Sequence, residues 1–199
     1  KFVGNIDSEN ISLMPSLTMI DISFNEFTGV FPNQLILKAP KLTSFVGGYN
    51  CFHGVISEDI CNVTSMTKFN APGLTSGESC RIPIWKGSAG LQKAFPTFTV
   101  HYMDGTLPEC LFGMNNMKEL IVSGNGLLGR IPEAEKIAPS LTSLVLSNNR
   151  LKGVIPKDLL EKARNLTTID VSVNYIAGNM DAFASVNDGE RDLSNMVVR

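Results

Sequence analysis

The segment at residues 140–156, "SLTSLVLSNNRLKGVIP", decides the fold. Its apolar residues Leu141, Leu144, Leu146, Leu151 and Ile155 lie at offsets of 0, 3, 5, 10 and 14. This spacing fits neither the 3.6-residue period of a helix nor the strict alternation of a long strand. Gly153 then relaxes the backbone for a bend, and Pro156 fixes φ where the chain turns. The segment is therefore typical of one unit of a repeat.

The same pattern recurs along the chain. It appears as "SLTMIDISFNEFTGVFP" (16–32), "KLTSFVGGYNCFHGVIS" (41–57), "NMKELIVSGNGLLGRIP" (116–132) and "NLTTIDVSVNYIAGNM" (165–180). One glycine recurs in each unit: Gly4, Gly29, Gly54, Gly105, Gly129, Gly153 and Gly178. The gaps are 25, 25, 51, 24, 24 and 25 residues, and Cys80 in "SCRIP" would divide the 51 into 26 and 25. We therefore predict about seven units and a partial first one over residues 1–180, irregular at 66–108, with 181–199 as a cap or linker.

Each unit has a simple physical interpretation. Leu141, Leu144 and Leu146 place alternate side chains on one side of a short strand, where they point into a shared interior. An asparagine follows each strand, and its side chain can pair the backbone of a neighbouring turn. These asparagines are Asn25, Asn50, Asn125, Asn149 and Asn174. Stacked units bury a continuous apolar row that no unit buries alone. The pattern predicts an α/β repeat solenoid, a right-handed superhelix with a parallel β-sheet on the concave face and an irregular or short-helical convex side.

The quoted segment resembles the plant-type leucine-rich repeat, whose consensus is LxxLxLxxNxLxGxIP. Such repeats occur in ectodomains of plant receptor kinases and receptor-like proteins, in polygalacturonase-inhibiting proteins and in protist surface proteins. The resemblance covers about residues 2–180 and implies a leucine-rich repeat solenoid. It does not identify a ligand, because one scaffold serves many partners.

The middle of the array departs from the pattern. Leu74 and Met103 stand where asparagines are expected, and Gly47 and Ala71 replace inward aliphatic residues. The single tryptophan, Trp85, lies in this region. Two interpretations stay open: a binding or bending point, or drift in a degenerate repeat.

Composition limits the partners. The 199 residues are 43% hydrophobic, with a net charge of −2 and a pI near 5.7. The sequence has no run of Lys or Arg. Nucleic acid and anionic membrane surfaces are therefore not expected partners. No apolar run approaches the ~20 residues of a membrane span. The chain begins in mid-unit with "KFVGNI", so we expect a piece of a longer chain or an end that docks on a neighbour.

Sequons and cysteines point to the outside of the cell. The glycosylation candidates are Asn10, Asn62 and Asn165. Cys51 and Cys80, on the same side of adjacent units, are the expected disulfide, since bridged Cα atoms lie within about 7 Å. Cys110 is expected to lie two units from Cys51 and Cys61, too far for a disulfide with either. For Cys61 and Cys110, both buried free thiols and disulfide-bonded cysteines stay open. We expect an extracellular or cell-surface location.

An enzyme is not expected. His53 and His101 are the only histidines, which excludes a site with several His ligands, and no second ligand pair follows "CFH" at 51–53. The expected register separates Cys51 from His101 by roughly 10 Å, too far for a nucleophile and its base. Phosphate-cradling, HExxH and GxSxG motifs are missing. We predict no catalytic residue, no metal and no cofactor.

The exposed strand positions predict a concave binding surface. The candidate ligand-binding residues are Phe24, Val46, Tyr49, Thr99, His101, Tyr102, Ile121 and Val145. Exposed aromatic and β-branched side chains there are typical of a contact patch. The alternative is that β-branched residues simply favour strands.

Two functions are compatible with this surface. The first is a non-enzymatic recognition module, the extracellular ligand-binding portion of a surface or secreted protein, whose partner is another protein, a peptide or a glycan. The alternative is a building block of a coat, filament or matrix that assembles through its uncapped end, by self-association or on a neighbouring leucine-rich repeat chain. The concave aromatic residues favour the first function, and the mid-unit start favours the second.

Overall fold

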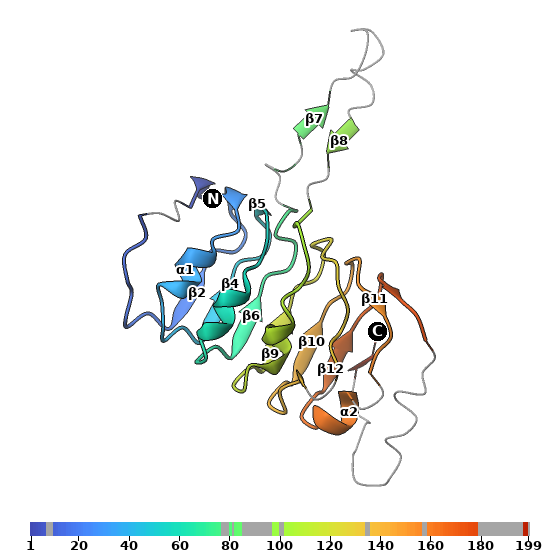
Figure 1. Ribbon diagram of the computed structural model, residues 1–199. Coiled ribbons are helices and arrows are strands. Elements are labelled where there is room, and N and C mark those ends of the chain that lie inside the picture. Colours follow the sequence, from blue (N-terminus) through green and yellow to red (C-terminus); the bar gives the residue numbers. More distant parts are fainter. Residues whose placement is uncertain are drawn as a thin grey trace.

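The computed structural model describes residues 1–6, 10–76, 80, 82–84, 97–99, 102–133, 136–156, 159–178 and 197–198. Successive turns of the chain stack side by side into a curved array, which Figure 1 shows from blue to red. Each turn is called a coil below. Consecutive coils contribute neighbouring strands to one parallel sheet, as the sequence predicted.

The main sheet lines the inner face of the solenoid. Within the described residues it has seven parallel strands, in the order β14-β12-β10-β9-β6-β4-β2. The strands are β2 (Met19–Asp21), β4 (Ser44–Val46), β6 (Lys68–Asn70), β9 (Glu119–Ile121), β10 (Ser143–Val145), β12 (Thr168–Asp170) and β14 (Val197–Val198). The register aligns one inward row: Ile20, Phe45, Phe69, Leu120, Leu144 and Ile169. All six are buried, so the apolar spacing of the sequence produces a continuous core.

Short helical segments close the outer side of several coils (Figure 1). They are α1 (Asn33–Leu37), η1 (Glu58–Asn62), η3 (Glu109–Gly113) and α2 (Leu159–Lys162). Each buries an aliphatic residue against the strands: Ile36, Ile60, Leu111 and Leu159. The helices have only four or five residues, because each coil must return to the inner sheet within about 24 residues.

A second set of strands runs along the lateral side of the solenoid. It contains the parallel sheet β1 (Val3–Asn5), β3 (Glu26–Val30) and β5 (Cys51–His53), and the pair β11 (Lys152–Gly153) and β13 (Tyr175–Ile176). A single bridge between Thr106 and Leu128 lies between the two groups. These lateral strands were not predicted from the sequence. Strands β3, β5, β11 and β13 begin one to three residues after an asparagine of the repeat.

The expected repeat count is wrong in the middle of the chain. β6 pairs directly with β9, with Phe69 opposite Leu120, so the 51-residue interval closes one coil and not two. Asp104 N–H donates to the Gly54 carbonyl at 2.8 Å, which places the end of this coil directly beside the preceding coil. The residues between Ser76 and Tyr102 therefore form an insertion.

The described part of the insertion is an antiparallel strand pair. β7 (Ile82–Ile84) pairs with β8 (Thr97–Thr99), and the pair stands away from the body of the solenoid in Figure 1. Thr99 lies opposite Ile82 in this pair and not in the main sheet. Its expected place on the concave face is therefore wrong, because a short "SCRIP" match was mistaken for the end of a repeat.

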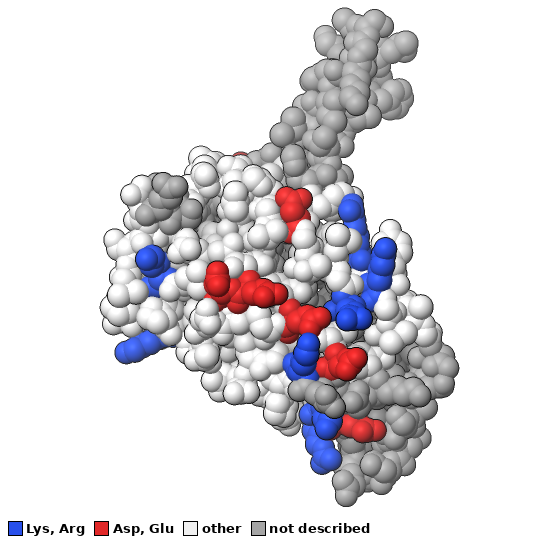
Figure 2. Space-filling view, in the orientation of Figure 1, with Lys and Arg blue, Asp and Glu red and all other residues white. Residues whose placement is uncertain are grey.

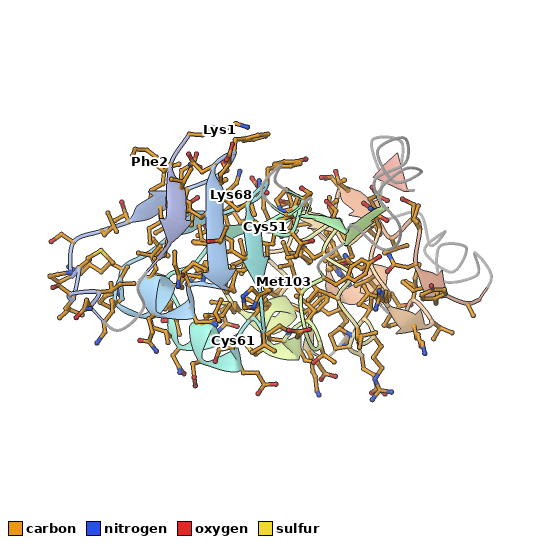
Figure 3. All side chains as sticks on the ribbon, turned by 90° about the horizontal axis from the view of Figure 1, so that it is seen from above. Lys1, Phe2, Cys51, Cys61, Lys68 and Met103 are labelled. Carbon is orange, nitrogen blue, oxygen red and sulfur yellow. A yellow bond between two sulfur atoms is a disulfide. The ribbon has the colours of Figure 1, made fainter. Side chains whose placement is uncertain are left out.

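The insertion also explains the disulfides. Cys51 and Cys80 form one bridge, with Cα atoms 5.2 Å apart, at the start of the insertion. Cys61 and Cys110 form the other, with Cα atoms 6.1 Å apart, between η1 and η3 among the outer helices (Figure 3). The expectation that Cys110 cannot reach Cys61 is wrong, because the two cysteines belong to adjacent coils.

The irregular residues of the middle coils are packed in the core. Phe45 fills the space that a side chain at Gly47 would occupy, since a Cβ there would lie 2.7 Å from the Phe45 ring. Ala71, Leu74 and Met103 are buried, and Figure 3 shows Met103 inside the solenoid. These departures are therefore accommodated by repacking, which large inward aromatic residues allow.

The main sheet continues past residue 180, where the sequence suggested that the repeats end. β14 pairs in parallel with β12, with Val198 opposite Ile169. The two described residues of the expected cap or linker thus extend the inner sheet.

Candidate functional site

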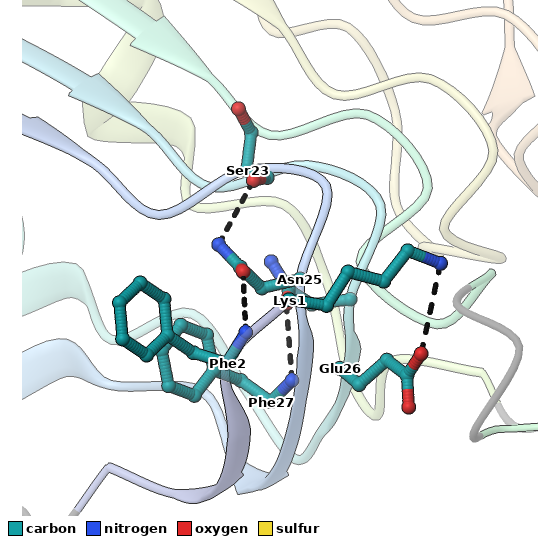
Figure 4. A network of polar contacts seen from close by, with 7 residues as sticks. Lys1, Phe2, Ser23, Asn25, Glu26 and Phe27 are labelled. Atoms are coloured by element: carbon teal, nitrogen blue, oxygen red, sulfur yellow. Dashed lines mark hydrogen bonds and ion pairs between the residues drawn. The ribbon is translucent and has the colours of Figure 1, made fainter.

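The asparagine ladder is a row of hydrogen bonds that joins neighbouring coils. In a typical step, Asn149 Oδ1 accepts from Leu127 N–H at 3.0 Å, and its Nδ2 donates to the carbonyls of Val122 and Leu146. Asn25, Asn50, Asn125 and Asn174 make equivalent bonds in their own coils. Figure 4 shows the first step, where Asn25 accepts from Phe2 N–H and Lys1 pairs with Glu26. The ladder satisfies backbone groups that a turning chain leaves unpaired.

Two further ladders lie just before several of the inner strands, and neither was predicted from the sequence. In one, the side chains of Ser65, Asn116, Ser140 and Asn165 donate to carbonyls of the preceding coil. In the other, the hydroxyls of Thr43, Thr67, Thr142 and Thr167 do the same. A recurring Ser, Asn or Thr just before the apolar triplet is the signal that could have revealed them.

The inner face carries an uncharged row with an aspartate at each end. The exposed position after each inward residue is occupied by Asp21, Val46, Asn70, Ile121, Val145 and Asp170. Val46, Ile121 and Val145 are half-buried. At the other end of the strands, Lys68 and Glu119 form an ion pair at 2.7 Å, which neutralises both charges. The ion pair has no net charge, and the row that follows the inward residues carries charge only at its two ends.

Asp21 marks one end of this row. Its Oδ1 accepts from the Ser23 hydroxyl at 2.6 Å and from the Ser23 N–H at 3.0 Å. These hydrogen bonds, the hydroxyl bond first, hold the pKa of Asp21 below its usual range. The carboxylate thus stays ionised at neutral and mildly acidic pH.

A column of residues with a left-handed backbone conformation borders the inner face. Each member comes directly before a position of the asparagine ladder in the sequence. Its members are Phe24, Tyr49, Gly73, Gly124, Asn148 and Val173, with φ between +53° and +71°. Backbone hydrogen bonds between coils fix the column, for example Phe24 N–H to the Gly48 carbonyl at 3.0 Å. Glycine and asparagine tolerate this conformation, whereas bulky side chains rarely adopt it.

Phe24 and Tyr49 form an exposed aromatic pair in this column. Their ring centroids lie 4.4 Å apart with planes inclined by 19°, and the residues are 66% and 43% exposed. Both were predicted as ligand-binding residues, and the fold brings them together at one end of the inner face.

Tyr102 lies elsewhere than the sequence predicted. It follows the insertion on the lateral side, where the N–H of the next residue, Met103, donates to the Asn125 carbonyl at 3.0 Å. The Arg150 guanidinium lies over its ring at 4.0 Å, above Gly126, where a Cβ would collide with the ring. The expected position of Tyr102 on the concave face is therefore wrong, again because the insertion was counted as a coil. His101, the remaining candidate, lies outside the described residues, as does Trp85.

The three glycosylation candidates are exposed. Asn10 precedes the first coil, Asn62 ends η1 beside the Cys61–Cys110 bridge, and Asn165 precedes β12. The Asn165 amide also donates to the Pro139 carbonyl at 2.9 Å.

Charged side chains gather on the face of the molecule that Figure 2 shows. Figure 2 shows acidic side chains across the middle of one face and basic ones beside them, toward the C-terminal half. A lateral groove of about 560 Å³ has Glu58, Glu109, Arg130 and Lys152 among its lining residues. Lys136 donates to Glu109 at 2.9 Å, and this bond holds the pKa of Glu109 below its usual range. Mixed charges of this kind favour solvation over a selective site.

The described part of the chain offers little basis for catalysis. Among those residues, no group of three or more His, Cys, Asp or Glu side chains is arranged to hold a metal ion. Nor does any helix there have the length and apolar character needed to cross a membrane.

Comparisons of sequence agree with the repeat. A family profile described as Leucine Rich Repeat matches residues 140–161. Receptor-like protein 7 of Arabidopsis thaliana is 28% identical over 171 residues, which cover 83% of this chain and 17% of that protein. Receptor-like protein 39 of the same plant is 33% identical over 76 residues, 38% of this chain and 8% of that protein. The chain thus spans less than a fifth of the length of these relatives.

Solved structures share the fold. The ectodomain of the Arabidopsis receptor kinase HAESA, in complex with the peptide hormone IDA and the co-receptor SERK1, has a TM-score of 0.64 and 26% identity over 87% of this chain and 24% of that chain. The ectodomain of GASSHO1/SCHENGEN3 from Arabidopsis thaliana, in complex with CASPARIAN STRIP INTEGRITY FACTOR 2, has a TM-score of 0.68 and 24% identity over 90% of this chain and 18% of that chain. A plant ice-binding protein has a TM-score of 0.65 and 20% identity over 89% of this chain and 47% of that chain.

These comparisons indicate no enzyme family, and they give no support to the building-block alternative. The ice-binding protein illustrates that one scaffold serves different functions, so fold alone does not identify a ligand. The repeat spacing, the asparagine ladder and the matches to receptor-like proteins together show that this chain is a leucine-rich repeat solenoid resembling plant receptor ectodomains.

Proposed function

We propose that this protein is a ligand-recognition module that binds an extended peptide or protein segment along its inner face. The observation that carries the proposal is an uncharged row bordered by the Phe24–Tyr49 pair. The row consists of Val46, Asn70, Ile121 and Val145. A contact surface of this kind is depleted of charge at its centre and enriched in aromatic residues. Thr99, His101 and Tyr102 are not part of the proposed surface.

The likeness to HAESA supports a peptide as the ligand. That receptor, at 26% identity, was solved with a peptide hormone and a co-receptor. An inner sheet presents several coils side by side at a spacing of about 4.8 Å, so an extended segment can contact one residue of each coil in turn. The energy of binding is expected to come from a few apolar anchors and not from the whole surface.

The test compares two valines. Val145 lies on the inner face, whereas Val154 is 59% exposed outside it. Peptides are selected on the wild-type protein from a displayed library of random sequences, and their affinities for the variants Val145→Glu and Val154→Glu are measured by titration calorimetry. We expect Val145→Glu to weaken binding at least about 30-fold, which is about 2 kcal/mol, because it buries an unpaired charge.

The control variant Val154→Glu is expected to bind within about twofold of the wild type. Both variants should keep the thermal midpoint of the wild type, since neither valine is in the core. Equal affinities of the two variants would show that the selected peptides bind elsewhere and would refute the inner-face site.

We place the module outside the cell or at its surface. Two disulfides and three exposed sequons support this location. We expect protein from its native source to lose mass on enzymatic deglycosylation, with glycan on at least one of Asn10, Asn62 and Asn165. Intact-mass spectrometry checks this, and changing the three asparagines to glutamine supplies the control. A mass equal to that of the bare chain would contradict the proposed location.

A further inference from the structure

One end of the uncharged row carries an exposed carboxylate. Asp21 lies opposite Val46 in the pairing of β2 with β4, so it continues the row by one strand. Asp21 is exposed, whereas Asp170 at the other end of the row is half-buried. Asp21 is therefore the acidic group that a ligand on this row meets at the β2 end.

The Asp21 carboxylate is held in place with one oxygen to spare. Oδ1 accepts the Ser23 hydroxyl at 2.6 Å and the Ser23 N–H at 3.0 Å. Within the described part of the chain these are the polar contacts of the Asp21 side chain, so Oδ2 keeps its capacity to accept. A side chain that is already fixed loses little conformational freedom when it pairs with a ligand.

The negative charge of Asp21 is not compensated by a described cation. No Lys or Arg among the described residues forms an ion pair with this carboxylate. Lys68 is the single Lys or Arg of the described inner strands, and it pairs with Glu119 at 2.7 Å. The bonds from Ser23 also lower the pKa of Asp21, so it is ionised at neutral pH. Because covering an unpaired carboxylate is unfavourable, a ligand that covers Asp21 needs a cation there.

The neighbours of Asp21 on the inner face are apolar. Met19, two residues earlier on the same face of β2, is 56% exposed, and Val46 lies opposite on β4. Lys and Arg combine an apolar stem with a charged head, so their side chains fit a carboxylate between apolar groups. We propose that Asp21 selects peptides with a Lys or Arg at the end that reaches β2, and that Oδ2 accepts from this cation. The inference rests on the proposed function, because it names a specificity-determining residue for a peptide on the inner face.

The strand order predicts where the basic residue lies in the peptide. From β10 to β2 the sheet takes four steps, through β9, β6 and β4. At about 4.8 Å for each step, Val145 and Asp21 are separated by about 19 Å. An extended peptide advances about 3.3 Å for each residue, so the basic residue should lie about six positions from the residue that contacts Val145.

Peptides selected on the wild-type protein supply the test. We expect Lys or Arg to be enriched at one end, and replacing it by methionine, which keeps the length but removes the charge, to weaken binding about fivefold. Asp21→Asn keeps an oxygen that accepts from Ser23 and should weaken the parent peptide by about the same factor. The methionine peptide should bind wild type and Asp21→Asn within about 1.5-fold of each other. Titration calorimetry measures the four affinities as a double-mutant cycle.

Asp104→Asn is the matched control. Asp104 is an exposed aspartate on the lateral side, where its N–H donates to the Gly54 carbonyl. This variant should bind the parent peptide within about 1.5-fold of the wild type, and both aspartate variants should keep the wild-type thermal midpoint. Equal affinities of the two variants for the parent peptide, or an effect of Asp21→Asn that is the same for parent and methionine peptides, would overturn the inference.

The two proposals can fail separately. Peptides that depend on Val145 but carry no basic residue coupled to Asp21 overturn this inference and leave the proposed function standing. Coupling to Asp21 in peptides whose affinity survives Val145→Glu supports the ion pair and overturns the uncharged row as the binding site. A library that yields no binder overturns both.

Discussion

Replacing Asn125 by alanine is expected to lower the free energy of unfolding by about 3–5 kcal/mol. Asn125 is fully buried, and its Oδ1 accepts from Leu74 N–H at 2.6 Å. Its Nδ2 donates to the carbonyls of Ala71 and Val122, each at 2.8 Å. Alanine would leave the Leu74 N–H and the Ala71 carbonyl buried without these bonds, at about 1–3 kcal/mol for each group that water does not reach. The Val122 carbonyl would keep its bond from Asn149 Nδ2.

Urea denaturation measures this effect, and Asn165→Ala is the control. Asn165 is also an inter-coil asparagine, but it is exposed and makes one described bond, to Pro139. Water replaces that bond, so the control should cost less than about 1 kcal/mol. If the two variants lost equal stability, the buried ladder would not be the main polar support of the coils.

Removing the Cys61–Cys110 bridge is expected to have the second large effect. The bridge closes a chain segment with a sequence separation of 49 residues and spans the β7–β8 insertion. The double variant Cys61→Ser/Cys110→Ser should lose about 2–5 kcal/mol of unfolding free energy, mainly because the unfolded chain regains freedom. Thermal unfolding of the oxidised protein measures the loss.

The control is thiol counting. In the oxidised wild-type protein, a thiol-alkylating reagent should modify no cysteine before reduction and four after it. A double variant as stable as the wild type, or Cys61 and Cys110 alkylated without reduction, would contradict the bridge. It would also remove the support for placing η1 and η3 in adjacent coils.

The repeat was predictable from the sequence because its physics is periodic. The inward row from Ile20 to Ile169 and the asparagine ladder both follow from residues at fixed offsets in every coil. The lateral strands were missed, since strands of two to five residues have no periodicity to detect. The Ser and Thr ladders were missed because polar residues before a strand are common in loops.

The insertion could not be found by counting residues. Cys80 stands in "SCRIP", which resembles the end of a repeat and lies where a repeat should end. Only the strand pairing distinguishes an insertion from a further repeat: β6 pairs directly with β9, so no inner strand lies between them. Every wrong placement follows from this one error: Thr99 and Tyr102 on the inner face, and Cys110 beyond the reach of Cys61.

The aromatic pair was predictable only in part. The register placed Phe24 and Tyr49 in one column, but their close stacking and left-handed backbones depend on the turn geometry of the folded coils.

Photo-cross-linking of a selected peptide tests the inner-face account most directly. A peptide that carries a benzophenone side chain at its centre is bound and irradiated, and the labelled fragments are identified by mass spectrometry. We predict labels on residues 44–49, 119–124 and 143–148, which contain β4, β9 and β10. Labels confined to the outer helices, such as η3, or to the lateral strand β11 would show that ligands bind outside the inner face and would contradict the account.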